Sequence, residues 1–295
     1  MPSKLDDLPQ DHTLVGVYPT AFRAVKTGDA ETLTNLLSEN PDLANARSQQ
    51  GRTLLNHLCD WPGHFPNEVE IGRVLIDAGA DINARAIDPD SGETSLQWAV
   101  SSNDVIMAEF LIESGASVNG LDDDLRPLAQ ALFYGCSEVA ASLVRKGATV
   151  NLEFAAGLGR DDLIPGFFNS NHHLLPHAGA HTAPINNAIT RQQPKEELLE
   201  QSLIYAVITD RVEAAKVLLD YGADLKAMPS GFHFIGTPLH WAAGGECLSM
   251  AEFLVLHGAD IHAEAPDDKA TPLDIAKGRR SDAMIRLLRK LGATR

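Results

Sequence analysis

The stretch 236–263, GTPLHWAAGGECLSMAEFLVLHGADIHA, contains every part of a short structural unit. Thr237 can cap a helix through its hydroxyl, and Pro238 suits the first helical position, where no amide donor is needed. Apolar residues follow at helical spacing on both sides of a Gly-Gly turn. Gly258 can then end the second helix in the left-handed conformation. The stretch therefore predicts two helices joined by a tight turn and closed by a glycine.

The closing phrase of this unit recurs along the chain. The phrase returns with its glycine, each followed by alanine, at positions 79, 115, 147, 222, 258 and 292, so that the successive glycines of the phrase are 36, 32, 75, 36 and 34 residues apart. A period of roughly 33 residues is typical of stacked helix pairs, each of which buries its apolar face against its neighbours. The sequence therefore predicts an all-α solenoid.

The phrases TPLH at 237–240 and GAD at 258–260 resemble the ankyrin repeat. Less complete openings occur at Thr53, Thr94, Arg126 and Thr271. The resemblance implies an ankyrin-repeat solenoid of about eight helix-turn-helix units with hairpin fingers. It also implies that the imidazole of His240 hydrogen-bonds loop backbone, and that Trp98 and Trp241 face a neighbouring unit.

Two units depart from the pattern. The segment 21–46 lacks the Gly-Ala stop and is expected to cap the N-terminal end, and the segment 154–168 is a shortened pair. We expect an N-terminal extension at 1–19, a first half of repeats at 20–168, a long His-bearing loop at 169–196 and a second half of repeats at 197–295. The loop is too polar and too interrupted by proline and glycine for a helix pair. It either contributes to a site or only links the two halves.

Composition excludes several classes of function. The net charge is -16, and no stripe of Lys or Arg is present to neutralise phosphates, which argues against nucleic acid and anionic membrane as partners. Cys59, Cys136 and Cys247 are widely separated, which favours a reducing compartment. The N-terminus has no apolar signal-like segment and no apolar run reaches membrane-spanning length, so we expect a cytoplasmic protein.

No cofactor or metal is predicted. The chain has no Walker A loop, GxSxG elbow or dinucleotide-binding GxGxxG. The densest set of potential metal ligands is formed by His172, His173, His177 and His181, but Pro176 and Gly179 argue against the helix that would align them. We interpret these histidines as part of a solvated loop.

In ankyrin-type proteins the binding surface is usually concave and is made of the ends of the first helices and the fingers. By register, the resemblance assigns to this surface Trp61, Ser101, Ser102, Phe133, Tyr134 and the finger residues Phe232, His233 and Phe234. Exposed aromatic side chains are common anchors of protein interfaces, although these could equally fill space beside the shortened unit. The predicted function is a protein-protein interaction module, whose acidity favours a partner with a basic patch. The sequence indicates no oligomeric state.

The alternative is an enzyme that acts on a small molecule in a pocket formed by the groove and the 169–193 loop. The acid/base candidates for such a site are His57, Asp60, His64 and Tyr134. The competing interpretation of the segment 57–64 is a loop that packs on its neighbours.

Overall fold

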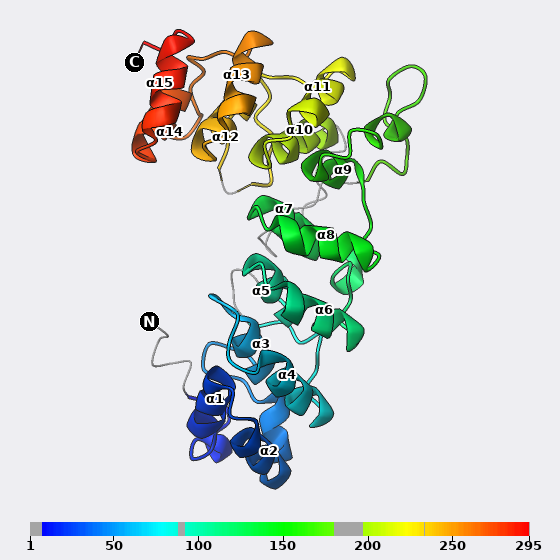
Figure 1. Ribbon diagram of the computed structural model, residues 1–295, viewed down its shortest axis with the longest axis vertical. Coiled ribbons are helices and arrows are strands. Elements are labelled where there is room, and N and C mark those ends of the chain that lie inside the picture. Colours follow the sequence, from blue (N-terminus) through cyan, green and yellow to red (C-terminus); the bar gives the residue numbers. More distant parts are fainter. Residues whose placement is uncertain (1–7, 88–91, 180–196, 233, 295) are drawn as a thin grey trace. The chain divides into compact units, whose positions relative to one another are not determined.

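The computed structural model describes residues 8–87, 92–179, 197–232 and 234–294 of the chain (Figure 1). In these residues the regular structure consists of fifteen α-helices with short 3-10 helices. Extended pairing within the same residues is limited to isolated bridges, such as Arg47 with Thr53. The predicted all-α fold is confirmed.

The first compact unit comprises the described residues of 8–148. Its helices form four consecutive pairs: α1 (Tyr18–Thr27) with α2 (Ala30–Glu39), α3 (Leu54–Cys59) with α4 (Glu68–Asp77), α5 (Ser95–Ser101) with α6 (Val105–Glu113), and α7 (Arg126–Phe133) with α8 (Ser137–Arg145). The 3-10 helices of this unit are η1 (His12–Leu14), η2 (Pro41–Asn45) and η3 (Leu121–Asp123).

The second compact unit comprises residues 149–179 and 197–294. It begins with a shortened pair, in which α9 (Leu152–Leu158) is followed by the 3-10 helix η4 (Ile164–Phe167). The remaining helices are α10 (Leu198–Ile208), α11 (Val212–Asp220), α12 (Pro238–Gly244), α13 (Leu248–Leu256), α14 (Pro272–Gly278) and α15 (Asp282–Lys290). Because α9 packs against α10, the shortened pair belongs to the second unit.

Helices of the same kind stack on one another in each unit. In the first unit α1, α3, α5 and α7 pack in sequence, as do α2, α4, α6 and α8. In the second unit the first helices α9, α10, α12 and α14 stack in the same way. Most residues of the first helices are buried, and many of them are leucine and alanine. The small alanine side chains allow the stacked backbones to approach closely.

The recurring Gly-Ala phrase ends the second helices α4, α6, α8, α11, α13 and α15 in a Schellman motif. After α4, the Gly79 N–H donates to the Ile76 carbonyl (2.9 Å) and the Ala80 N–H donates to the Leu75 carbonyl (3.0 Å). Gly79 has a φ of 92°, which a residue with a Cβ adopts only with strain. The alanine after each such glycine is buried, which explains why both residues recur: Ala80, Ala116, Ala148, Ala223, Ala259 and Ala293.

The first helices α3, α5, α9, α12 and α14 begin at side-chain caps. At α5, the Thr94 hydroxyl accepts from the Gln97 N–H (3.4 Å) and Gln97 Oε1 accepts from the Thr94 N–H (3.0 Å). At α12, Nδ1 of His240 accepts from the Thr237 N–H (3.2 Å), so its Nε2 carries the proton that is donated to the Ala270 carbonyl (3.0 Å). The expected structural role of His240 is confirmed.

The predicted positions of the two tryptophans are also confirmed, since Trp98 and Trp241 are both buried. Among the residues that the structure describes, none of the helices combines the length and apolar character needed to cross a membrane.

Candidate functional site

The lengthened turn at 60–67 carries a highly exposed aromatic side chain. Trp61 is 78% exposed and lies directly after α3. Its backbone N–H donates to Oδ1 of Asp60 (2.8 Å), and Oδ2 of the same carboxylate pairs with Arg52 (3.1 Å). The indole therefore projects into solvent from a turn whose backbone is fixed.

The same turn lies against the end of α5. Gly63 has a φ of 70°, and a Cβ added there would lie 3.0 Å from Cβ of Ser102 and 3.4 Å from Oδ2 of Asp104. Glycine is therefore required at this position both by backbone conformation and by close approach.

The ends of α5 and α7 are in contact as well. Ser101 and Ser102 are partly buried, and the Ser101 carbonyl lies 3.8 Å from the Cys136 thiol just beyond α7. Tyr134 is 46% exposed and meets Phe133 edge to face, with ring centroids 5.4 Å apart. The structure thus places Trp61, Ser101, Ser102, Phe133 and Tyr134 at the ends of three successive first helices, and we call this set the rim.

A network of polar side chains links the helices that carry the rim. Trp98 Nε1 donates to one oxygen of Glu93 (2.5 Å), and Gln130 Nε2 donates to the other. The Arg52 guanidinium lies 4.7 Å from the Trp98 ring centroid and also pairs with Asp60. The first helices of three repeats are therefore linked by side chains as well as by apolar packing.

The predicted finger residues lie in the second unit and are less accessible than the rim. Phe232 is 7% exposed and packs between Tyr205 (5.8 Å between centroids) and Trp241 (5.1 Å). Phe234 is partly buried and also contacts Trp241 (5.5 Å). His233 lies outside the described residues. The structure thus places Phe232 in the core of its unit, which leaves little of its ring for a partner.

The acid/base candidates of the enzyme alternative occupy separate environments. His57 is 1% exposed, with its ring against Phe22 (4.9 Å), and burial together with the nearby positive charge of Lys26 lowers its pKa to about 3. Asp60 pairs with Arg52, as described above. Burial, together with the charge of Glu93, raises the pKa of the Tyr134 hydroxyl, and the Tyr134 ring packs against Phe133.

His64 contacts two carboxylates that the sequence analysis did not name. Its Nδ1 lies 3.6 Å from Oδ2 of Asp104, and potential ligand atoms of His64, Glu68 and Asp104 all lie within 4.8 Å of one another. Burial and the neighbouring charge of Asp104 raise the pKa of Glu68 to about 7. Asp104 is the N-cap of α6. Its place in the sequence, one repeat after the turn, is the signal that could have identified it.

The described part of the His-bearing loop packs onto its own unit. His172 lies over Tyr221 (4.7 Å between centroids), whereas His177 Nε2 lies 3.3 Å from the Gly166 carbonyl. Phe168, just before the loop, stacks on Tyr221 (4.1 Å). His172 and His177 therefore have different partners, and His181 lies outside the described residues.

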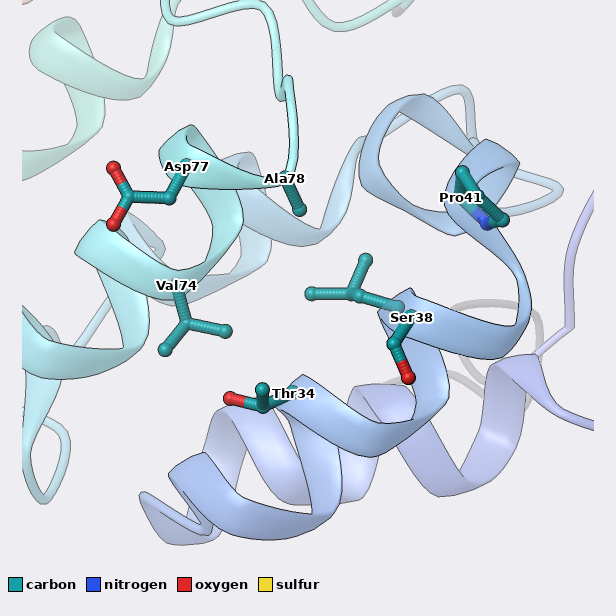
Figure 2. Close-up of a pocket in the computed structure, with 7 residues that line it drawn as sticks. Thr34, Ser38, Pro41, Val74, Asp77 and Ala78 are labelled. Carbon is teal, nitrogen blue, oxygen red and sulfur yellow. The ribbon is translucent and has the colours of Figure 1, made fainter.

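A groove of about 420 Å³ lies between α2 and α4, and none of the predicted site residues lines it (Figure 2). Its lining hydroxyls bond within their own helix, Thr34 to the Ala30 carbonyl (2.8 Å) and Ser38 to the Asn35 carbonyl (2.8 Å). Asp77 is the only charged side chain in its lining. The groove presents neither an acid/base pair nor an activated nucleophile.

Comparison with known proteins gives matches to two family models. Residues 203–294 match the model described as ankyrin repeats (3 copies), and residues 63–112 match the model described as ankyrin repeats (many copies). The second match begins within the turn that carries Trp61 and includes α4, α5 and most of α6. No curated protein matches the chain significantly.

Two solved structures are similar at low identity. The human ASB11 ankyrin repeat domain is 21% identical, with 83% of this chain and 100% of that chain covered and a TM-score of 0.38. The ankyrin repeat domain of Bcl-3, described as a unique member of the IkappaB protein family, is 21% identical, with 91% and 97% covered and a TM-score of 0.41. On the two family matches and the repeated helix pairs, residues 63–112 and 203–294 are ankyrin repeats.

Proposed function

We propose that the chain binds a protein partner through the rim, on the concave side that the family resemblance implies. Ankyrin repeats are generally modules of protein-protein interaction. The observation that carries the proposal is the 78% exposure of Trp61 on a turn fixed by Asp60 and Gly63. The backbone that carries this indole is already fixed, so less conformational freedom is lost when a partner covers it, and tryptophan is among the residues most often found at interface hot spots.

The rim offers a second anchor. Tyr134 is half-exposed, and its edge-to-face contact with Phe133 restricts the ring. Ser101 lies at the end of the helix between the two anchors and its hydroxyl donates to the Trp98 carbonyl (3.0 Å), whereas the hydroxyl oxygen of Ser102 is buried. Two exposed aromatic rings suit the apolar centre of a protein interface.

The partner is proposed to carry a basic patch. The chain has a net charge of -16, so its field attracts cationic surfaces over a distance of about one Debye length. Association is expected to weaken about tenfold when NaCl is raised from about 50 mM to about 500 mM, because salt screens this attraction. Binding titrations of the purified partner at the two salt concentrations check this, and an unchanged affinity would contradict the charge argument.

The rim itself is tested by substitution of its anchors. The full chain, Trp61→Ala, Tyr134→Ala and a control are immobilised, and proteins captured from native lysate are quantified by mass spectrometry. The control is Ile106→Ala, which removes a side chain of 64% exposure from the second helix α6 of the same unit. We expect a partner that the control retains and that Trp61→Ala loses at least tenfold, as removal of a hot-spot side chain costs about 2 kcal/mol or more. Equal capture by all four proteins rejects the rim as the binding surface.

No observation on the described residues favours the enzyme alternative. His57 is enclosed in the core, Asp60 is held by Arg52, and His64 faces carboxylates rather than the other candidates. The loop that would close its pocket lies, from residue 180 onward, outside the described residues.

A further inference from the structure

Three side chains that can bind a metal ion come together in the first unit from three different elements. His64 belongs to the lengthened turn, Glu68 is the first residue of α4, and Asp104 is the N-cap of α6 in the following repeat. Their nearest ligand atoms lie within 4.8 Å of one another, and Nδ1 of His64 lies 3.6 Å from Oδ2 of Asp104. The turn therefore brings an imidazole to two carboxylates across the boundary between two repeats.

Asp104 is held in a fixed orientation. Its side chain is 2% exposed, its Oδ1 accepts from the Met107 N–H (3.0 Å), and its Oδ2 accepts from the backbone N–H of His64 (3.1 Å). These two donors fix both oxygens without using all of their lone pairs. A buried carboxylate is costly unless it is compensated by charge, yet its ion-pair partner is the ring of His64, which is 60% exposed. The site thus has a preorganised ligand with remaining capacity for a cation.

Two further oxygens at this place lack partners. Oε2 of Glu68 and Oγ of Ser102 are buried without a hydrogen bond. Ser102 lies beside Gly63, where an added Cβ would be close to both Ser102 and Asp104. Buried polar atoms are paired in the great majority of cases, so an unpaired oxygen on Glu68 and another on Ser102 indicate a missing positive charge or donor.

We propose that His64, Glu68 and Asp104 bind one divalent transition-metal cation of the zinc class. Imidazole with carboxylates suits zinc, whereas calcium and magnesium prefer oxygen ligands alone. With metal–ligand bonds of about 2.1 Å, tetrahedral ligand atoms lie about 3.4 Å apart. The 3.6 Å separation of the His64 and Asp104 atoms is close to this value. The exposed His64 ring and the long Glu68 side chain can make the remaining adjustment, and water completes the coordination.

The site is tested with zinc ions alone on the full chain, first stripped of metal with a chelator. Isothermal titration and competition with a zinc-binding dye measure stoichiometry and affinity. We expect one zinc ion per chain, and at least a tenfold loss of affinity in each of His64→Gln, Glu68→Gln and Asp104→Asn. Asp104→Asn keeps an oxygen for the Met107 cap, and circular dichroism checks its fold. Should it fail to fold, the other two variants decide, because both of their side chains are partly exposed.

Two controls separate this site from other zinc ligands. Glu70→Gln removes an exposed carboxylate from the same turn of α4, and the double variant His172→Gln/His177→Gln removes histidines of the His-bearing loop. Both are expected to bind zinc as the unmodified chain does. No bound zinc, binding that the three site variants leave unchanged, binding lost in the His172/His177 variant, or tighter binding of calcium than of zinc would each overturn the proposal. The measurement uses the chain alone, so its outcome is independent of whether the rim binds a protein.

Discussion

The imidazole ring of His57 is buried away from water, and one of its nitrogens has no hydrogen bond in the protein. Its Nε2 is buried and has no hydrogen bond, and one edge of the ring packs against Phe22. A proton on this ring would place positive charge in an apolar site near Lys26 and Arg52, which is why the pKa falls to about 3. The neutral ring is therefore part of the folded state.

This burial predicts a loss of stability in mild acid. The unfolded chain takes up a proton on His57 below its ordinary pKa of about 6.5, whereas the folded chain does not until the pH nears 3. The unfolded state binds more protons in this window, so stability falls as the pH drops. Between about pH 7 and pH 5, His57 alone should cost about 2 kcal/mol. Urea unfolding at both pH values measures it, and His57→Leu should lose about that much less than the unmodified chain. Equal losses would place the ring in water.

Gly63 and Gly79 offer a matched pair at the residue scale. Both have positive φ, so an alanine incurs backbone strain of about 1 kcal/mol at either position. Only at Gly63 does the added Cβ also press on Ser102, since nothing lies within 4 Å of it at Gly79. Gly63→Ala should therefore lower the free energy of unfolding by about 1 kcal/mol more than Gly79→Ala, as measured in urea. If the two variants are equally stable, the turn does not pack on α5 as described.

At the scale of elements, the first helices are too short to persist alone. α3 has six residues and α5 has seven, well below the length at which isolated helices are stable in water. They are held by stacking on their neighbours and by caps that satisfy the first backbone N–H groups.

Substitution of a capping residue should consequently lower the stability of the whole repeat. Thr94→Ala removes the oxygen that accepts from the Gln97 N–H and is expected to cost about 1 kcal/mol of stability. Thr34→Ala is the control, because the exposed Thr34 hydroxyl only bonds a carbonyl of its own helix and its loss should change stability by less than about 0.5 kcal/mol. Thermal or urea unfolding distinguishes the two. A Thr94 variant as stable as the Thr34 variant would contradict the capping argument.

The helix pairs and their ends were predictable because their signals are local. Each glycine stop and each threonine cap is encoded within a few residues of the helix that it ends or begins, and the period then places Trp61 and Tyr134 at helix ends. An insertion has no period, so the sequence could not tell whether Phe232 points inward or outward. The sequence also could not predict that Glu68 lies close to Asp104, because their proximity depends on the path of the turn at 60–67.

At the scale of the whole molecule, the chain divides into two compact units. In a repeat protein the energy is held in each repeat and in the contacts between neighbours, so a group of several repeats can fold without the rest. Which unit the shortened pair joins followed from the packing of α9 on α10, a contact that a period of 33 residues does not specify.

The two units are therefore expected to fold as separate fragments. Fragments 1–148 and 149–295 should each give a helical circular dichroism spectrum and a cooperative urea transition, because each has its own stack of first helices. A third fragment, 169–295, is the control: it lacks α9 and exposes the face of α10 that α9 covers, and it should be less stable than 149–295. The expectation fails if 1–148 or 149–295 remains unfolded, or if loss of α9 has no effect.

The lengthened turn at 60–67 is a place where the sequence can vary without altering the helices on either side. It adds residues at a point where α3 has ended and α4 has not begun, and the later repeats keep their glycine stops and threonine caps in place. The residues of that segment can vary while the helices are retained, so foreign loops can be grafted at this turn. A library that varies positions 61, 62, 65 and 66 but keeps Asp60, Gly63, His64 and Asn67 would explore recognition without rewriting the repeat.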